Sequence, residues 1–296
     1  MAQAQKSPET TQESSSLANL GLALSDWFER WFPDAFALAL TAAVIVAGAS
    51  MLAGSTALET AQRFGAGFWD LVAFTMQMSM IIVTGYAVAT APPVYAMIRA
   101  LAKVPTTGPG AAAYVGLFSM LASLVSWSFS LIFSGLLARE VTNRVKGADY
   151  RAVGAAAYLG VGSVWALGLS SSAALIMAAP ASLPDAIEKI SGVIPLGQTL
   201  GLWQSFVVAG AIIVVSMAIS YFSAPPASQA RGMAEMGVIY TPPAFNTDKR
   251  QTPGEWLEYS PVLTLIVSAL GLGYMAREVA TAGPAVILDL NHYVFL

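Results

Sequence analysis

The feature that most constrains this chain is a series of long segments without one Asp, Glu, His, Lys or Arg side chain. They cover residues 71–97, 104–138, 152–184 and 190–230. A soluble globule of this size needs charged side chains to solvate its surface, yet only 10% of the residues are charged and 56% are hydrophobic. The mean hydropathy is +0.64. The sequence therefore predicts an all-α integral membrane protein, whose helices satisfy their own backbone hydrogen bonds in lipid.

Composition also excludes several classes of function. The net charge of −3 provides no basic surface for nucleic acid, so we expect no nucleic-acid partner. The chain has no cysteine, and His292 is its one histidine, which excludes disulfides, thiolate metal sites and a cysteine nucleophile. Ser170, Ser171 and Ser172 have no base within their segment to activate them as nucleophiles. We expect neither an enzyme nor a bound metal or cofactor.

The lengths of the apolar segments predict the domain organisation. A bilayer core of about 30 Å is spanned by about 20 helical residues, and by that measure five segments cross: 35–53, 69–90, 152–180, 196–222 and 260–276. Around them we expect a disordered polar tail (1–25), a first membrane repeat (26–222) that includes an interfacial helix (92–105), a cytoplasmic linker (223–259) and the incomplete start of a second repeat (260–296). Aromatic residues at 27–32 are expected at the headgroup level.

The segment 110–138 does not fit a simple crossing, because as one helix it would be about 43 Å long. The positive-inside rule distinguishes a crossing from a hairpin that enters and leaves on the cytoplasmic side. With a hairpin, eleven of the 14 Lys and Arg residues are cytoplasmic and three (Arg63, Lys189 and Arg277) are outside. With a crossing, six are cytoplasmic and eight are outside. The charges therefore predict a re-entrant hairpin and a cytoplasmic N-terminus.

Serines gather at the predicted tip of this hairpin and again in the next helix. The tip, at 125–130, contains Ser126, Trp127, Ser128, Phe129 and Ser130. A turn at mid-membrane depth leaves backbone groups unpaired, so it must be buried in protein or line a wet cavity.

The second cluster, Gly168, Ser170, Ser171 and Ser172, predicts that the helix at 152–180 is broken there. Two interpretations of the serines remain open. They either bond to nearby carbonyl groups and permit close helix packing, or they form a ligand site.

If they form a site, its chemistry follows from the half-helix ends. Helix N-termini and hydroxyl groups bind a carboxylate, and free carbonyl oxygens bind a small cation. The four segments listed above have no Asp, Glu, His, Lys or Arg to carry a proton. We therefore expect that Na⁺, rather than a proton relay, would serve as the coupling ion.

Three stretches resemble the short-chain fatty acid transporter family of the ion transporter superfamily. They are "FGAGFWDLVAFTMQMSMIIVTGYAVA" (64–89), "LLAREVTNRVKGADYRAVGAAAYLG" (136–160) and "SGVIPLGQTLG" (191–201). A family tip motif similar to Asn-Trp-Gly-Phe-Gly falls on 126–130, where serine occupies three positions, and the family's Gly-rich break falls on 165–172.

The resemblance implies a function and an architecture. It implies symport of short monocarboxylates into a bacterium across the inner membrane, by two inverted repeats that each contribute a hairpin and a broken helix. On this basis we expect the chain to be the N-terminal half of such a transporter, either a fragment or a naturally truncated relative, completed as a homodimer or by a separate chain that supplies the second repeat. The alternative is a membrane scaffold or assembly protein that does not transport.

Overall fold

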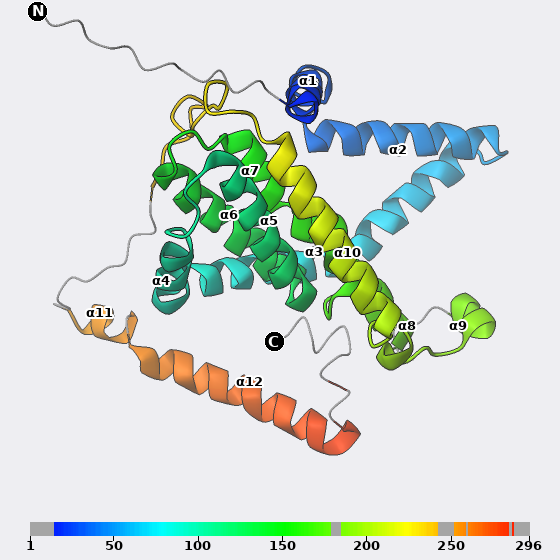
Figure 1. The fold of residues 1–296 in the computed structure, drawn as a ribbon. Helices are drawn as coiled ribbons and strands as arrows, with labels where there is room; N and C mark the ends of the chain where they lie inside the picture. Colours follow the sequence, from blue (N-terminus) through cyan, green and yellow to red (C-terminus); the bar gives the residue numbers. More distant parts are fainter. Residues whose placement is uncertain (1–14, 179–184, 242–251, 259, 284–285, 287–296) are drawn as a thin grey trace, which may run out of the picture.

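The computed structural model describes residues 15–178, 185–241, 252–258, 260–283 and 286, and within them every regular element is a helix (Figure 1). The longer helices are α1 (Ser16–Trp31), α2 (Ala35–Leu52), α3 (Ala57–Thr90), α4 (Pro92–Leu101), α5 (Gly108–Val125), α6 (Trp127–Arg144), α10 (Trp203–Ser223) and α12 (Pro261–Ala282). The shorter ones are α7 (Tyr150–Ala157), η1 (Gly160–Val164), η2 (Trp165–Leu167), α8 (Ser172–Ala178), α9 (Asp185–Ser191), η4 (Leu196–Gln198) and α11 (Pro253–Glu258).

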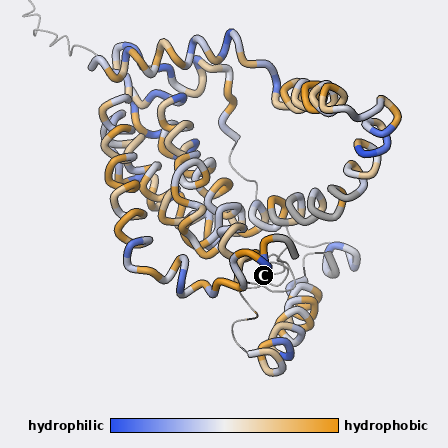
Figure 2. Tube along the Cα trace, turned by 90° about the vertical axis from the view of Figure 1, so that its right-hand side faces the viewer, coloured by the Kyte–Doolittle hydropathy of each residue, from blue (hydrophilic) through white to orange (hydrophobic). Residues whose placement is uncertain are grey.

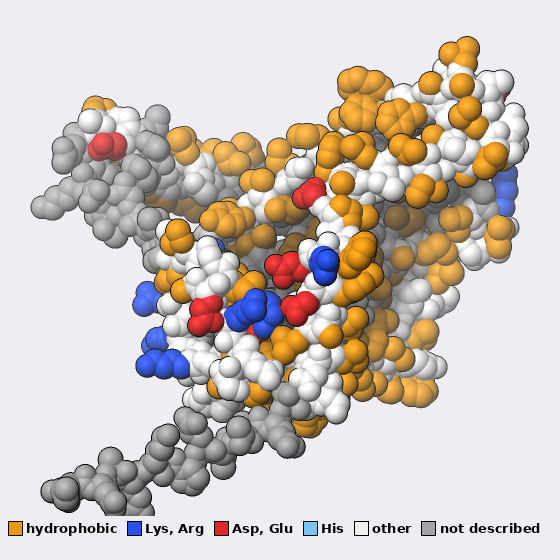
Figure 3. Space-filling view, turned by 90° about the horizontal axis from the view of Figure 1, so that it is seen from above, with side chains coloured by type: hydrophobic (Ala, Val, Ile, Leu, Met, Phe, Trp, Pro, Cys, Tyr) orange, Lys and Arg blue, Asp and Glu red, His pale blue; other side chains and the backbone are white. Residues whose placement is uncertain are grey.

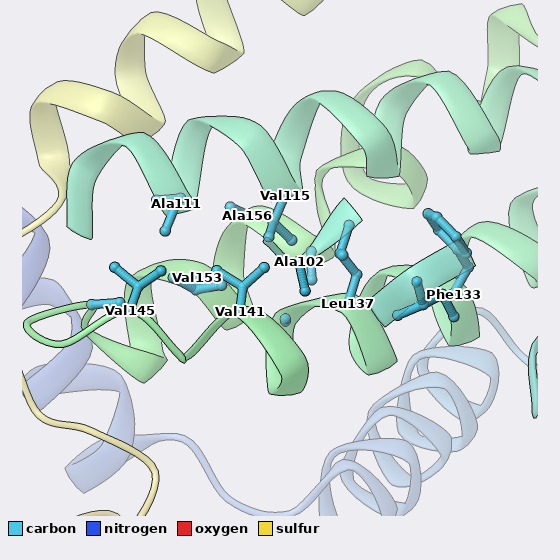
Figure 4. Close-up of a cluster of buried hydrophobic side chains, with 14 of the residues drawn as sticks. Ala102, Ala111, Val115, Phe133, Leu137, Val141, Val145, Val153 and Ala156 are labelled. Carbon is cyan, nitrogen blue, oxygen red and sulfur yellow. The ribbon is translucent and has the colours of Figure 1, made fainter. Parts of the chain in front are cut away.

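The core of the fold lies between the two limbs of the hairpin, α5 and α6, and the helices packed on them. Helix α7 contacts both limbs, α10 covers α5, and α3 and α4 cover α6 (Figure 1). Figure 4 shows Ala111 and Val115 of α5 facing Val141 of α6 and Val153 and Ala156 of α7, all buried. Small side chains at these positions let the helix backbones approach closely, which improves the van der Waals packing that helps to hold helices together in lipid.

The outer surface of the helices is apolar, as a lipid-facing surface requires. Helix α2 has no buried residue, and the side chains of α10 and α12 are mostly exposed, with large apolar residues along their length (Figure 2). Five helical segments are long and apolar enough to cross a membrane: 35–52, 108–125, 150–178, 203–223 and 253–282. The chain is therefore a multi-pass membrane protein of the all-α class.

This set of five differs from the predicted set at one position. It contains the first limb of the hairpin, and it does not contain 69–90. That segment is the C-terminal part of α3, where seven side chains (70, 71, 73, 74, 77, 78 and 81) lie outside the described residues.

Two helices begin earlier than their apolar segments do. The prediction that 16–25 is disordered is wrong, because Ser15 caps the N–H of Ala18 (3.1 Å) and α1 starts at once. Helix α3 begins at Ala57 rather than at 69, because Thr56 and Glu59 form a capping box. Residues 1–14, the rest of the predicted tail, lie outside the described part of the chain.

One helix begins later than predicted. Helix α10 starts at Trp203 rather than at 196, after the 3₁₀ turn η4. A tight turn follows η4, in which the N–H of Gly201 donates to the carbonyl of Leu196 (2.9 Å). A Cβ on Gly201 would lie 2.9 Å from the Cα of Gly197, so the turn requires glycine. Helix α4, predicted as an interfacial helix, ends at Leu101 instead of 105.

Candidate ligand site at the hairpin tip

A single residue, Ser126, joins the two limbs of the hairpin. Its N–H donates to the carbonyl of Ala122 (2.9 Å) and ends α5, while its side chain accepts from the N–H of Phe129 (3.4 Å) and begins α6. Serine is a favoured N-cap because its hydroxyl oxygen replaces the missing helical acceptor. The turn is thus tighter than the predicted 125–130. Each limb has 18 residues and a length of about 27 Å.

The helix after the hairpin is broken where the Gly and Ser cluster predicts it. Helix α7 ends at Ala157, a π turn (η1) and a 3₁₀ turn (η2) follow, and α8 begins only at Ser172. Between them Gly168 is extended (φ −98°, ψ 169°). The residues from Gly168 to Ser171 therefore form the non-helical connection between the two halves.

The structure brings this connection against the hairpin tip through two hydrogen bonds. The N–H of Leu169 donates to the carbonyl of Leu124 (2.7 Å), and the N–H of Trp127 donates to the hydroxyl of Ser170 (2.9 Å). A Cβ on Gly168 would lie 2.6 Å from the Cα of Leu124 and 2.7 Å from its carbonyl oxygen. Only glycine permits this approach.

Three hydroxyl groups thereby gather at the N-terminus of α6. The Oγ atoms of Ser126 and Ser128 are 3.2 Å apart, and the Oγ atom of Ser170 accepts a hydrogen bond from the N–H of Trp127. Ser128 and Ser170 are 7% and 3% exposed. Ser170 uses an oxygen lone pair for Trp127 and keeps its own proton to donate. Hydroxyl donors at the positive end of a helix dipole are suited to a carboxylate.

The other predicted residues have structural contacts or lie at the margin of this group. Ser130 donates to the carbonyl of Ser119 (2.7 Å), and Ser171 accepts from the N–H of Ala174 at the start of α8 (3.3 Å). Phe129 stacks on Phe133, with ring centroids 5.3 Å apart. Ser172 is the first residue of α8. The packing interpretation therefore describes Ser130 and Ser171 well.

Ser119 is a residue that the sequence reasoning missed. Its hydroxyl donates to the carbonyl of Ala157 (2.6 Å) and accepts from the N–H of Gly160 (2.9 Å). A side chain inserted into the helical ladder in this way explains why the π turn begins at Gly160. A Cβ on Gly160 would lie 2.6 Å from the hydroxyl of Ser130.

A regular spacing could have indicated this role. Serines recur at intervals of four on both limbs, at Ser119 and Ser123 on α5 and at Ser130 and Ser134 on α6, and all four are fully buried. The hydroxyl oxygens of Ser123 and Ser134 have no hydrogen-bond partner within the described part of the chain. The serines thus form a seam along the inside of the hairpin, of which the tip is one end.

Two buried carboxylates lie away from the tip and hold the segment after α10 against the bundle. Glu140 accepts hydrogen bonds from the hydroxyls of Tyr95 and Tyr240. Burial and the bond to Glu140 raise the pKa of Tyr95. Since Glu140 is twelve residues along α6 from Ser128, about 18 Å away, it takes no part in the tip.

Asp149, the N-cap of α7, accepts from the Arg151 side chain (2.8 Å) and from the backbone N–H groups of Ala152 and Arg231 (both 3.0 Å). Burial by itself would raise the pKa of Asp149, but these three hydrogen bonds outweigh burial and lower the pKa. Among the described residues, no three His, Cys, Asp or Glu side chains come together as metal ligands.

Comparisons with known proteins agree with this architecture. The family model for short chain fatty acid transporters matches residues 16–296. A protein of Escherichia coli (strain K12), provisionally named a short-chain fatty acid transporter, is 34% identical over 277 residues, and one of Haemophilus influenzae with the same name is 28% identical over 282 residues. Each match covers 92% of this chain and 62% of the relative, so the chain spans less than two thirds of their length. No solved structure matches the chain. Since the family model covers nearly the whole sequence, the chain belongs to the short-chain fatty acid transporter family.

Proposed function

We propose that this chain takes part in the uptake of short-chain fatty acids or similar small monocarboxylates, and that the hairpin tip supplies one half of the carboxylate site. The observation that carries the proposal is the contact between Trp127 and Ser170, which places the break of one helix on the N-terminus of another. Family membership supports the substrate class.

The proposed site binds the carboxylate through the hydroxyls of Ser126, Ser128 and Ser170. A hydrogen bond to a charged group is worth about 1.5–3 kcal/mol, and the N-terminus of α6 adds about half a positive charge. Trp127, the first residue of α6, is partly exposed, and we propose that its indole contacts the short aliphatic tail. A site of this kind recognises a small anion without a basic side chain.

We propose Na⁺ as the coupling ion. The two buried carboxylates described above, Glu140 and Asp149, lie at the ends of α6 and α7 away from the tip, and the tip itself is built from hydroxyl, carbonyl and N–H groups. Hydroxyl and carbonyl oxygens are ligands that suit a hard cation. A proton, in contrast, needs a titratable carrier near the substrate.

The proposal also includes an orientation and a partner. We propose that the protein lies in the bacterial inner membrane with its N-terminus in the cytoplasm, on the basis of the distribution of Lys and Arg residues. The carboxylate would be enclosed by a second element of the same kind, supplied by another copy of this chain or by a separate chain.

Equilibrium binding to the purified protein in lipid vesicles tests this proposal. Radiolabelled butyrate should bind in Na⁺ buffer and lose most of its affinity when choline replaces Na⁺. Butyramide, which has the same shape without the charge, should not compete. If butyramide competes as well as butyrate, there is no carboxylate site. If binding ignores Na⁺ and changes strongly between pH 6 and 8, coupling is to protons. If no monocarboxylate binds, the scaffold alternative is favoured.

A further inference from the structure

Two adjoining pockets lie at the end of the bundle away from the serine tip, one between α1, α7 and α10 and the other between α1, α7 and residues 228–235 after α10. The first, of about 280 Å³, is lined mainly by small and apolar side chains, among them Leu22, Leu159 and Ile219. The second, of about 500 Å³, is lined mainly by charged and polar side chains, among them Asp26 and Glu235. Leu22 and Arg151 line both, so the two pockets adjoin at these side chains, one mainly apolar and the other mainly polar.

The polar part holds a cation and an anion side by side. The Nε and Nη2 atoms of Arg151 are bonded to Asp149 (3.3 and 2.8 Å), so the guanidinium is fixed in place. Its Nη1 atom lies 4.0 Å from a carboxylate oxygen of Asp26, too far for a hydrogen bond. The side chain of Asp26 is 70% exposed and that of Arg151 is 16% exposed. Each group therefore has hydrogen-bonding capacity left for a ligand.

The surrounding charge is mixed, with a small excess of carboxylates. Asp26, Asp149 and Glu235 line the space together with Arg151 and Arg231, which makes three carboxylates against two guanidinium groups. Figure 3 shows acidic and basic side chains gathered on this face and framed by apolar ones. A purely anionic ligand is disfavoured here, whereas a ligand with one negative and one positive group matches the site.

Exposed tryptophans on α1 point to the membrane–water interface as the depth of the pockets. Helix α1 presents Trp27 and Trp31 outwards, at 52% and 66% exposed, and Trp is enriched at membrane–water interfaces. Its opposite face, with Ala18 buried, packs on the end of α10, where the hydroxyl of Ser15 donates to the carbonyl of Phe222 (2.6 Å). The helix thus closes one side of the pockets at the interface.

We propose that the two adjoining pockets together bind a phospholipid with a zwitterionic, primary-ammonium headgroup, namely phosphatidylethanolamine. The phosphate accepts from Nη1 of Arg151, the ammonium donates to Asp26, and an acyl chain enters the apolar part beside Leu22 and Ile219. Phosphatidylcholine has the same phosphate but no N–H donor for Asp26. Phosphatidylglycerol has the phosphate alone and meets the excess of carboxylates.

Native mass spectrometry of the purified chain, taken from vesicles with equal parts of the three lipids, tests the proposal. The protein should retain phosphatidylethanolamine about tenfold over phosphatidylcholine, the effect of one hydrogen bond to a charged group. Asp26→Asn should reduce this preference to about one, and Glu188→Gln on α9, an exposed position outside both pockets, should leave it unchanged.

Three results would overturn the proposal. Equal retention of phosphatidylethanolamine and phosphatidylcholine by the unmodified protein would show that the ammonium is not recognised. Retention of phosphatidylglycerol at the same level would show that Arg151 binds a phosphate alone. A preference that survives Asp26→Asn would place ammonium recognition elsewhere. Because Asp26 is mostly exposed and its contact with Arg151 is long, loss of its charge should leave folding intact, which a melting curve checks.

Discussion

Replacing Gly168 by alanine should separate the broken helix from the hairpin tip. The new Cβ would lie 2.6–2.8 Å from the Cα, carbonyl carbon and carbonyl oxygen of Leu124. These are backbone atoms, so no flexible side chain can move aside, and one of the two segments must shift. The shift would stretch the adjacent hydrogen bond from the N–H of Leu169 to the carbonyl of Leu124.

The loss in the free energy of unfolding has two parts. Overpacking a tightly packed position costs about 1–3 kcal/mol, and a lost hydrogen bond adds about 0.5–1.5 kcal/mol. We therefore expect Gly168→Ala to lower the free energy of unfolding by about 2–4 kcal/mol. Butyrate affinity should fall as well, because the shift removes Ser170 from the N-terminus of α6.

Unfolding of the purified protein in mixed detergent micelles measures this loss, with Gly154→Ala as the matched control. Gly154 lies in α7, and nothing lies within 4 Å of the position that its Cβ would occupy. Alanine there should be neutral or stabilise the helix by up to about 1 kcal/mol. If the two variants unfold alike, the close approach of Gly168 to Leu124 is not a feature of the folded protein.

Three other predictions test separate parts of the account. Ser123→Ala should keep or raise stability and leave butyrate binding unchanged, because the hydroxyl is buried without a partner among the described residues; a clear loss in an unfolding titration would show that the hydroxyl has one. Asp149→Asn should lower the free energy of unfolding by about 3 kcal/mol at pH 7. The pKa of Asp149 is lower in the folded state, so its contribution to stability is present above the unfolded pKa of about 4 and is lost as the pH falls through the folded pKa. The free energies of unfolding of the protein and the variant should therefore converge in acid. A difference that does not depend on pH would contradict the assignment. Single cysteines at 145 and 187 should react with impermeant reagents from opposite sides of the membrane, and labelling from one side would refute the hairpin topology.

The hairpin and the broken helix could be predicted from the sequence because each leaves a local compositional signal. A charge-free segment too long for one crossing must tilt, turn or break, and the distribution of Lys and Arg along the whole chain favoured a turn. Gly168 beside three serines indicated the break in the same way. These arguments need only the bilayer thickness, local residue types and the positions of Lys and Arg along the chain.

The helix starts were missed although the signals were present. Apolar windows locate the membrane-spanning part of a helix and ignore the polar turns that precede it. The Thr56 and Glu59 pair is a capping box that can be read directly, and Ser15 precedes an amphipathic run.

The contacts of the site could not be predicted. Which serine reaches which backbone group depends on how α5, α6 and the broken helix pack. Ser119 bonds to Gly160 and Ser170 to Trp127 across large separations in the chain. The same applies to Glu140 and Asp149, whose partners in the segment after α10 lie 82 or more residues away.

The central claim, that the hydroxyls at the hairpin tip bind a carboxylate, is tested most directly by the dissociation constant of butyrate for Ser170→Ala in Na⁺ buffer. Ser163→Ala is the control, because the hydroxyl of Ser163 bonds within its own segment, to the carbonyl of Leu159 (2.6 Å). Loss of a hydrogen bond to a charged group, about 1.5–3 kcal/mol, predicts that Ser170→Ala weakens binding about ten- to a hundredfold. If Ser170→Ala and Ser163→Ala bind butyrate as tightly as the unmodified protein, the serines at the tip serve only packing and the backbone, and the proposed site is wrong.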